Sequence, residues 1–138
     1  RLHVDITGAE SKANVLDVIG SGTSSAVYIG KCSTTYVGYV YKAEMMCIEA
    51  TVGGDLDVDL YSNSADLATD SEVTSSGTSV ELINAGGNWA VGMRKISTAG
   101  LTMTNGLHNH YLYLTTGNGT AGTYTAGKFV IKLYGANF

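Results

Sequence analysis

The fold of this chain is decided most clearly by the stretch GGDLDVDLY, residues 53–61. The glycine pair at its start is typical of a turn, and apolar and acidic residues alternate after it. Alternation with a period of two is typical of a β-strand that buries one face. The apolar residues of this strand, which we expect to point into a core, are Leu56, Val58 and Leu60.

Short runs of the same kind occur along the rest of the chain. The sequence has 18 Gly and no Pro, and a helical period is almost absent. We expect further strands within residues 2–6, 26–30, 36–52, 80–83, 89–96, 110–115 and 129–134. Most connections are too short for crossover helices, which favours antiparallel pairing. The prediction is an all-β chain with little helix, forming a single domain over residues 1–138. Its architecture would be an antiparallel β-sandwich, jelly-roll-like, with eight or nine strands.

The apolar phase of each strand predicts the core. In the long run 36–52 the apolar face changes from odd to even residues, so we expect a β-bulge or bend near Met45 and Met46. Cys32 and Cys47 lie in or beside β-like runs and could pair, but we favour two free, buried thiols. The complete predicted core set is Leu56, Val58, Leu60, Leu112, Leu114, Phe129, Ile131 and Leu133.

The charge pattern bears on the kind of partner. Charged residues make up 14% of the chain and the net charge is −4. Between Ala43 and Met93 there is no Lys or Arg, while nine of the twelve acids fall there. Such a distribution argues against nucleic-acid binding, which needs a basic stripe, and suits head-to-tail contact between identical subunits. Because no signal-like start and no run of about 18 apolar residues occurs, we expect no membrane attachment.

Glycine-rich motifs near the C-terminal end match the sequence pattern of phosphate-binding loops, but not the structural context that such loops need. Residues 117–122 read G-x-G-x-x-G and residues 122–128 read G-x-x-x-x-G-K. Phosphate binding at such a loop uses the N-terminus of a following helix, whereas β-branched and aromatic residues follow here. No nucleophile elbow or other catalytic motif is found. We therefore predict a protein that is not an enzyme and has no cofactor.

Two groups of residues could ligate a metal, and for neither do we predict one. Asp55, Asp57 and Asp59 alternate on one face, where they form either an exposed acidic face or part of a calcium site completed by loop acids. We favour the exposed face. His108 and His110 lie on one side of an extended segment, but the sequence places no third zinc ligand beside them.

Tyr111 and Tyr113 alternate with leucines on the strand at 110–115. If the leucines face the core, both tyrosines lie on the surface, where Tyr is a good anchor for a protein interface or a platform for a sugar ring. The alternative is a strand that is buried on both faces.

The C-terminal part resembles a known class of viral protein. YLYLTTG at residues 111–117, followed by GTYTAGKFVIKLYG at residues 122–135, is similar to the ending of small virion proteins of tailed bacteriophages, of the capsid cement or decoration type. This resemblance implies a structural subunit in the virion that clusters around capsid symmetry axes and clamps neighbouring shell proteins. Its partner would be the major capsid protein or another virion protein, and it would form a homo-oligomer.

A second resemblance is to secreted β-sandwich accessory modules, through residues 54–61 and 121–124. It implies a carbohydrate-binding module, with calcium assistance if the acidic strand binds that ion. For a cement-type protein we expect Tyr111 and Tyr113 to anchor the interface. Asp57 and Asp59, taken as exposed acids, would orient the partner.

Overall fold

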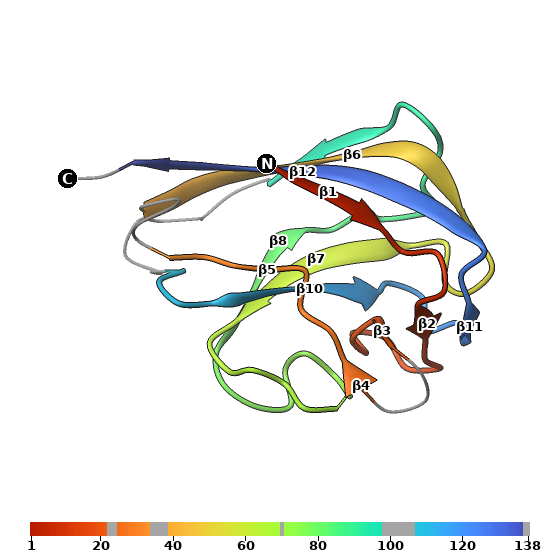
Figure 1. Cartoon of the computed structure of the whole chain (residues 1–138), viewed down its shortest axis with the longest axis horizontal. Coiled ribbons are helices and arrows are strands. Elements are labelled where there is room, and N and C mark those ends of the chain that lie inside the picture. The colour runs from red at the N-terminus through yellow and green to blue at the C-terminus, as the bar shows by residue number, and fades with distance from the viewer. Residues whose placement is uncertain (22–24, 34–38, 70, 98–106, 137–138) are drawn as a thin grey trace.

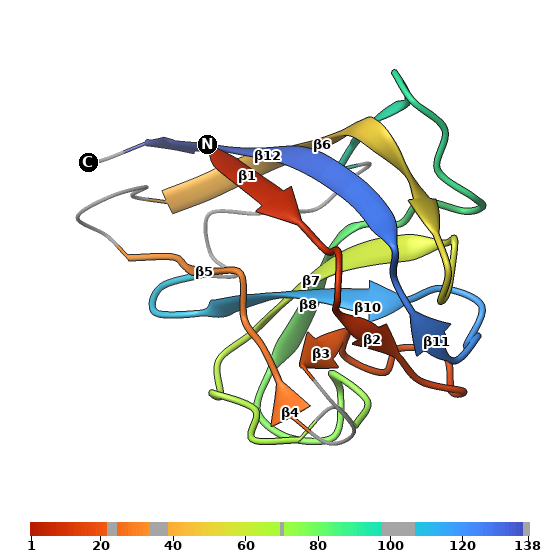
Figure 2. The same cartoon turned by 45° about the vertical axis from the view of Figure 1, so that its right-hand side comes forward.

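The computed structural model describes residues 1–21, 25–33, 39–69, 71–97 and 107–136. Within these ranges the chain forms β-strands and no helix, which confirms the all-β prediction. Three antiparallel sheets of four strands are present, shown from two directions in Figures 1 and 2. The described part contains twelve strands, more than the eight or nine expected, because five of them have only two residues.

We name the sheets I, II and III. Sheet I has the order β1 (Leu2–Asp5), β12 (Ala126–Ala136), β6 (Tyr39–Val52), β9 (Arg94–Ile96). Sheet II has the order β5 (Gly30–Lys31), β10 (Tyr111–Thr116), β7 (Val58–Asn63), β8 (Ser79–Ile83). Sheet III has the order β11 (Gly122–Thr123), β2 (Glu10–Ser11), β3 (Gly20–Ser21), β4 (Ser25–Ala26).

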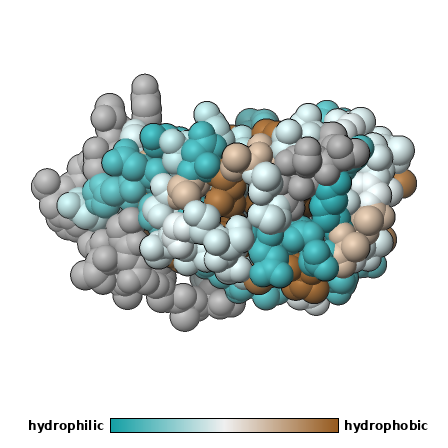
Figure 3. Space-filling view, turned by 90° about the horizontal axis from the view of Figure 1, so that it is seen from below, coloured by the Kyte–Doolittle hydropathy of each residue, from teal (hydrophilic) through white to brown (hydrophobic). Residues whose placement is uncertain are grey.

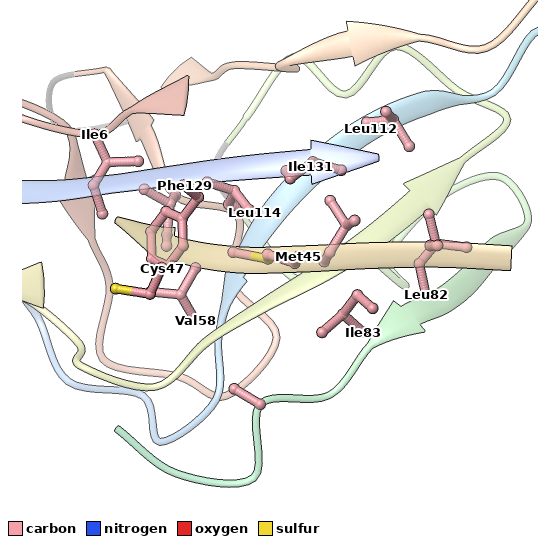
Figure 4. Packing of buried hydrophobic residues seen from close by; sticks show 14 of the residues in the cluster. Ile6, Met45, Cys47, Val58, Leu82, Ile83, Leu112, Leu114, Phe129 and Ile131 are labelled. Atoms are coloured by element: carbon pink, nitrogen blue, oxygen red, sulfur yellow. The ribbon is translucent and has the colours of Figure 1, made fainter. Parts of the chain in front are cut away.

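Sheets I and II face each other across the main hydrophobic cluster. Figure 4 shows side chains of β6 and β12 pointing toward those of β7, β8 and β10. Six of the eight predicted core residues are buried there, and Leu133 is half-buried against the cluster. Trp89 closes one side, because its Nε1–H donates to the Val58 carbonyl at 2.8 Å and its ring meets Phe129 edge-on at 5.3 Å. The six buried members are Val58, Leu60, Leu112, Leu114, Phe129 and Ile131.

The prediction for Leu56 is wrong, since 36% of this residue is exposed. Strand β7 begins only at Val58. Before it, the backbone amide of Asp57 donates to Oδ1 of Asp55 at 2.9 Å. This local hydrogen bond from an Asp side chain replaces strand pairing, so the alternation in the sequence begins before the strand does.

The predicted irregularity of the long strand is present, but not at Met45 and Met46 themselves. Register shifts between β6 and β12 fall at Tyr41, at Ile48, and between Glu49 and Val52. From Ala43 to Cys47 the pairing is regular, so Ala43, Met45 and Cys47 share one face and point into the core.

Both cysteines are buried and unpaired in the structure, as predicted. Burial raises the pKa of the Cys32 thiol to about 11 and also raises the pKa of Cys47. A thiol that stays protonated is a poor nucleophile and a poor metal ligand. The two cysteines therefore act as small core residues.

Candidate interaction surface

The acidic row does not form an exposed face. Asp55, Asp57 and Asp59 are all buried, with exposed fractions of 6% or less. The prediction that Asp57 and Asp59 are exposed is therefore wrong. A carboxylate can be buried when other groups donate hydrogen bonds to its oxygens. In this structure, backbone amides of two neighbouring loops donate to these carboxylates.

Asp55 binds the glycine-rich loop. Its Oδ2 accepts hydrogen bonds from the backbone amides of Asn118, Gly119 and Thr120 at 2.9, 2.7 and 3.2 Å. Successive backbone amides form a concave anion site, and the anion held here is a carboxylate of the same chain. This stretch of the G-x-G-x-x-G segment thus has a structural role, in agreement with the prediction that it is not a phosphate loop.

Asp57 and Asp59 lie further along the same segment, and burial raises the pKa of both carboxyls. The pKa of Asp59 rises to about 6, although the Ala85 amide donates to its Oδ1 at 2.7 Å and opposes the rise. For Asp57 the Gly87 amide and the charge of Lys95 oppose the rise. Oδ1 of Asp57 has no hydrogen-bond partner among the described residues. Because both acids are buried, they are parts of the interior and not contact residues.

The candidate metal ligands are not assembled into a site. Among the described residues, no group of three or more His, Cys, Asp or Glu side chains could hold a metal ion. His110 is buried, and its Nδ1 lies 3.0 Å from Oγ of Ser62. His108 instead packs edge-on against the Tyr39 ring at 4.5 Å.

Tyr113 is fully buried, so β10 is covered on both faces at this position. Its outer face packs with Val18, Tyr61, Leu67 and Val73 in a second hydrophobic cluster. The Tyr113 hydroxyl accepts from the Leu67 amide at 2.8 Å and lies 3.3 Å from the Ala65 carbonyl. Of the two alternatives for this strand, burial on both faces is correct at Tyr113. Tyr113 therefore cannot anchor a partner.

Tyr111, at the start of β10, remains half-exposed and belongs to a small aromatic cluster. The Tyr28 ring, of which 46% is exposed, meets the Tyr111 ring edge-on at 5.0 Å. The Lys31 ammonium lies over the Tyr111 ring at 4.7 Å from its centroid, and 3.4 Å from its hydroxyl. We call Tyr28, Lys31 and Tyr111 the tyrosine–lysine cluster. Aromatic rings with a cation fixed beside them are typical of the anchoring residues of protein interfaces.

The pairing of β5 with β10 builds this cluster. Lys31 lies directly opposite Tyr111 in the register, so the two side chains emerge on the same face. Sequence reasoning found Tyr111 but missed Tyr28 and Lys31. The pairing that brings these residues together spans about 80 positions, and no local pattern encodes it.

A groove runs beside the cluster, between the end strands β1 and β5. It has a volume of about 410 Å³. Apolar side chains of Leu2, Leu112, Ile131 and Leu133 line it, and Arg1 and Lys31 add two cations without any acid. We call it the β1–β5 groove. A second, largely apolar cavity of about 320 Å³ is lined by residues that include Val4, Ile29 and Leu114, with Asp5 as the one acid among the described residues around it.

A different, polar cleft lies between residues 12–17 and 69–75. It is lined by carboxylates and hydroxyls, including Asp17, Glu72, Thr69, Ser71 and Ser75, and has a volume of about 620 Å³. Figure 3 shows the molecule from below the view of Figure 1, and its hydrophobic residues form separate patches among polar ones.

Comparison of the chain with models of protein families, with curated proteins and with solved structures finds no match in any of the three. Among the described residues, no helix has the length and apolar character needed to cross a lipid bilayer. Proposals about function therefore rest on the surface features described above and on the resemblance of residues 111–135.

Proposed function

We propose that this chain is a non-enzymatic structural protein of a virion, of the capsid cement or decoration type. It would bind neighbouring shell subunits through the tyrosine–lysine cluster. The observation that carries this proposal is the fixed arrangement of Tyr28, Tyr111 and Lys31 on the surface beside the β1–β5 groove. The resemblance of residues 111–135 to the ending of such proteins supports it.

The facing of sheets I and II supports a jelly-roll-like β-sandwich as the architecture of this proposal. A subunit of this type would act as a rigid clamp, because its extended strands hold binding residues in fixed positions. The low charge supports contact with protein and not with nucleic acid or membrane. Self-association into a homo-oligomer, with the virion as its location, belongs to the same proposal.

The test needs a major capsid protein whose gene neighbours the gene of this chain, and empty shells are assembled from that protein. The absence of any such gene would itself count against the proposal. The protein is mixed with these shells, and bound material is sedimented. A Tyr28→Ala, Tyr111→Ala double variant is expected to dissociate faster, because truncation of a buried interface aromatic costs about 2 kcal/mol or more. Tyr41→Ala is the matched control, since Tyr41 is 47% exposed and lies outside the cluster. If the wild-type protein does not bind the shells, the proposal is refuted.

A second candidate function is a carbohydrate-binding module, which the polar cleft favours. Its exposed carboxylate and hydroxyl groups, such as those of Glu72 and Ser75, are groups that hydrogen-bond sugar hydroxyls. Calcium assistance loses its basis, because Asp55 and Asp59 are buried against backbone amides. A monomer retained on a polysaccharide column would favour this function, whereas self-association without retention would favour the virion function.

A further inference from the structure

The β1–β5 groove is the feature of the surface whose chemistry specifies a partner most closely. Its floor includes Leu112 and Ile131, which are core residues that connect it directly with the main hydrophobic cluster. Leu2 and Leu133 form apolar walls and are only partly buried. An apolar side chain entering here would extend the core of the molecule.

Two of the strands that line the groove, β1 and β5, are end strands. β1 pairs only with β12, and β5 only with β10, among the described strands. Figures 1 and 2 both show β1 above β5 on the same side of the molecule. End strands carry backbone N–H and C=O groups without a strand partner, and such groups can pair with an added strand. An extended peptide would therefore meet hydrogen-bonding backbone as well as an apolar floor.

The opposite side of the molecule is built differently. There the chain from Asn84 to Met93 passes between β8 and β9, and Trp89 fills the space over Phe129. Ala85 and Trp89 belong to the main cluster on that side. No aromatic residue is among the described residues that line the β1–β5 groove, so the two edges are not equivalent as docking sites.

The charges at the rim select the sign of the partner. Arg1 and Lys31 line the groove, and no acidic residue does. The Lys31 ammonium is held near Tyr111, so it is already ordered at the rim. A carboxylate arriving beside the Lys31 ammonium would gain a charge-assisted hydrogen bond without ordering a free lysine chain.

We propose that the β1–β5 groove binds an extended segment of a partner protein in which aliphatic and acidic residues alternate. Aliphatic side chains enter the apolar floor, acidic side chains meet Arg1 and Lys31, and the peptide backbone pairs with an end strand. This mode is β-strand addition, in which backbone hydrogen bonds give affinity and alternate side chains give specificity. The inference rests on the proposed function to the extent that the partner would be a shell protein.

The test is a titration of the isotope-labelled full chain with short peptides, followed by amide chemical shifts. The probe is acetyl-Val-Glu-Val-Glu-Val-amide. Three comparison ligands are the same peptide with Lys in place of Glu, the same peptide N-methylated at alternate residues, and octanoate. We expect the Glu peptide to shift the amides of β1 and β5, the Lys peptide to bind about tenfold more weakly, and N-methylation to abolish binding.

Lys31→Glu should weaken binding of the Glu peptide by about tenfold, and the Lys peptide should then become the better ligand. Lys132→Glu is the matched control, because Lys132 lies between Ile131 and Leu133 and so points to the other face of sheet I. It makes the same change of charge and should leave the affinity unchanged.

Three results would overturn the inference. The first is that the Glu peptide shifts only amides outside β1 and β5. The second is that the Glu and Lys peptides bind with equal affinity. The third is that octanoate binds as tightly as the Glu peptide and that N-methylation of the peptide does not change its affinity. The last result would identify a site for a free aliphatic acid. Since shells are absent from this assay, shell binding without peptide binding would refute the groove proposal alone. Peptide binding without shell binding would refute the proposed function alone.

Discussion

Asp55 and Gly119 lie 64 positions apart in the chain, and the Gly119 amide donates to Oδ2 of Asp55 at 2.7 Å. This bond joins the segment before β7 to the loop between β10 and β11. The two flanking amides donate to the same oxygen. One carboxylate thereby fixes the course of a loop that contains three glycines within residues 117–122.

Replacement of Asp55 by Ala should destabilise the protein strongly. The change leaves the amides of Asp57, Asn118, Gly119 and Thr120 without their acceptor. Hydrogen bonds to a charged group contribute about 1.5–3 kcal/mol each. Some of the freed loop amides can form hydrogen bonds with water instead, so we expect the free energy of unfolding to fall by about 3 kcal/mol in total. Urea denaturation followed by the fluorescence of Trp89, the single tryptophan, measures it.

Asp55→Asn is the control for this substitution. It keeps one carbonyl-type oxygen in place and should lose less stability than Asp55→Ala. A stability of Asp55→Ala within about 0.5 kcal/mol of wild type would contradict the role assigned to this carboxylate.

Asp59 should make stability depend on pH between about 4 and 6. Its pKa is raised from 3.8 to about 6, mainly by burial. The folded protein therefore binds more protons than the unfolded chain in this window, so its stability falls as pH rises through it. Asp59→Asn keeps an oxygen for the Ala85 amide and should be more stable than wild type at pH 7.5, by on the order of 2 kcal/mol.

At pH 3.5 most of the advantage of Asp59→Asn should be lost, because Asp59 is then protonated in the folded state and mostly protonated in the unfolded chain. Thermal unfolding at the two pH values measures the difference. Asp66→Asn removes a carboxylate from the exposed surface and serves as the control. If the Asp59→Asn variant were less stable than wild type at pH 7.5, the burial of this charge would not be the dominant effect.

Sequence reasoning succeeded where the strand pattern and the burial pattern coincide. Val58, Leu60, Phe129 and Ile131 are buried because each occupies the apolar phase of a real strand. It failed at Leu56 and the acids, because a local side-chain hydrogen bond delays the strand until Val58. The alternation of residues does not reveal which loop will supply amides to a carboxylate.

The surface could be predicted only in part, for a related reason. A period of two says that Tyr111 and Tyr113 share a face, but not that Leu67 and Val73 cover Tyr113. Tyr28 and Lys31 join Tyr111 through a pairing with only two register positions. Contacts of this kind depend on the three-dimensional path of the connections, which the residues of β10 do not encode.

Tyr113→Phe should separate a structural tyrosine from a surface one. Removal of the hydroxyl leaves the buried Leu67 amide without an acceptor, which costs about 1–2 kcal/mol. Tyr41→Phe removes the hydroxyl of an exposed tyrosine and should change stability by less than about 0.5 kcal/mol. Urea denaturation of both variants measures the difference. Equal effects of the two changes would show that the Tyr113 hydroxyl does not secure the loop over β10.

Gly53 and Gly8 provide a matched pair for the turn that precedes β7. Both have positive φ, 78° at Gly53 and 87° at Gly8. A Cβ at Gly53 would lie 2.2 Å from the Thr123 carbonyl oxygen, whereas one at Gly8 would meet no atom within 4 Å. The backbone strain of an alanine is thus similar at the two sites, and only Gly53 adds a collision with backbone.

We expect Gly8→Ala to lower the free energy of unfolding by about 1 kcal/mol, the cost of an L-residue in the left-handed region. Gly53→Ala should lower it by about 3 kcal/mol or more, because β11 or the turn must move to relieve the collision. Urea denaturation gives both values. The Gly8 amide donates to the Tyr124 carbonyl at 2.8 Å, so amide shifts of residues 122–125 should change in both variants, but more in Gly53→Ala, where backbone has to move. Equal losses in the two variants would mean that the turn at Gly53 can move away from β11 without cost, and the close approach would then have no part in holding sheet III against the end of sheet I.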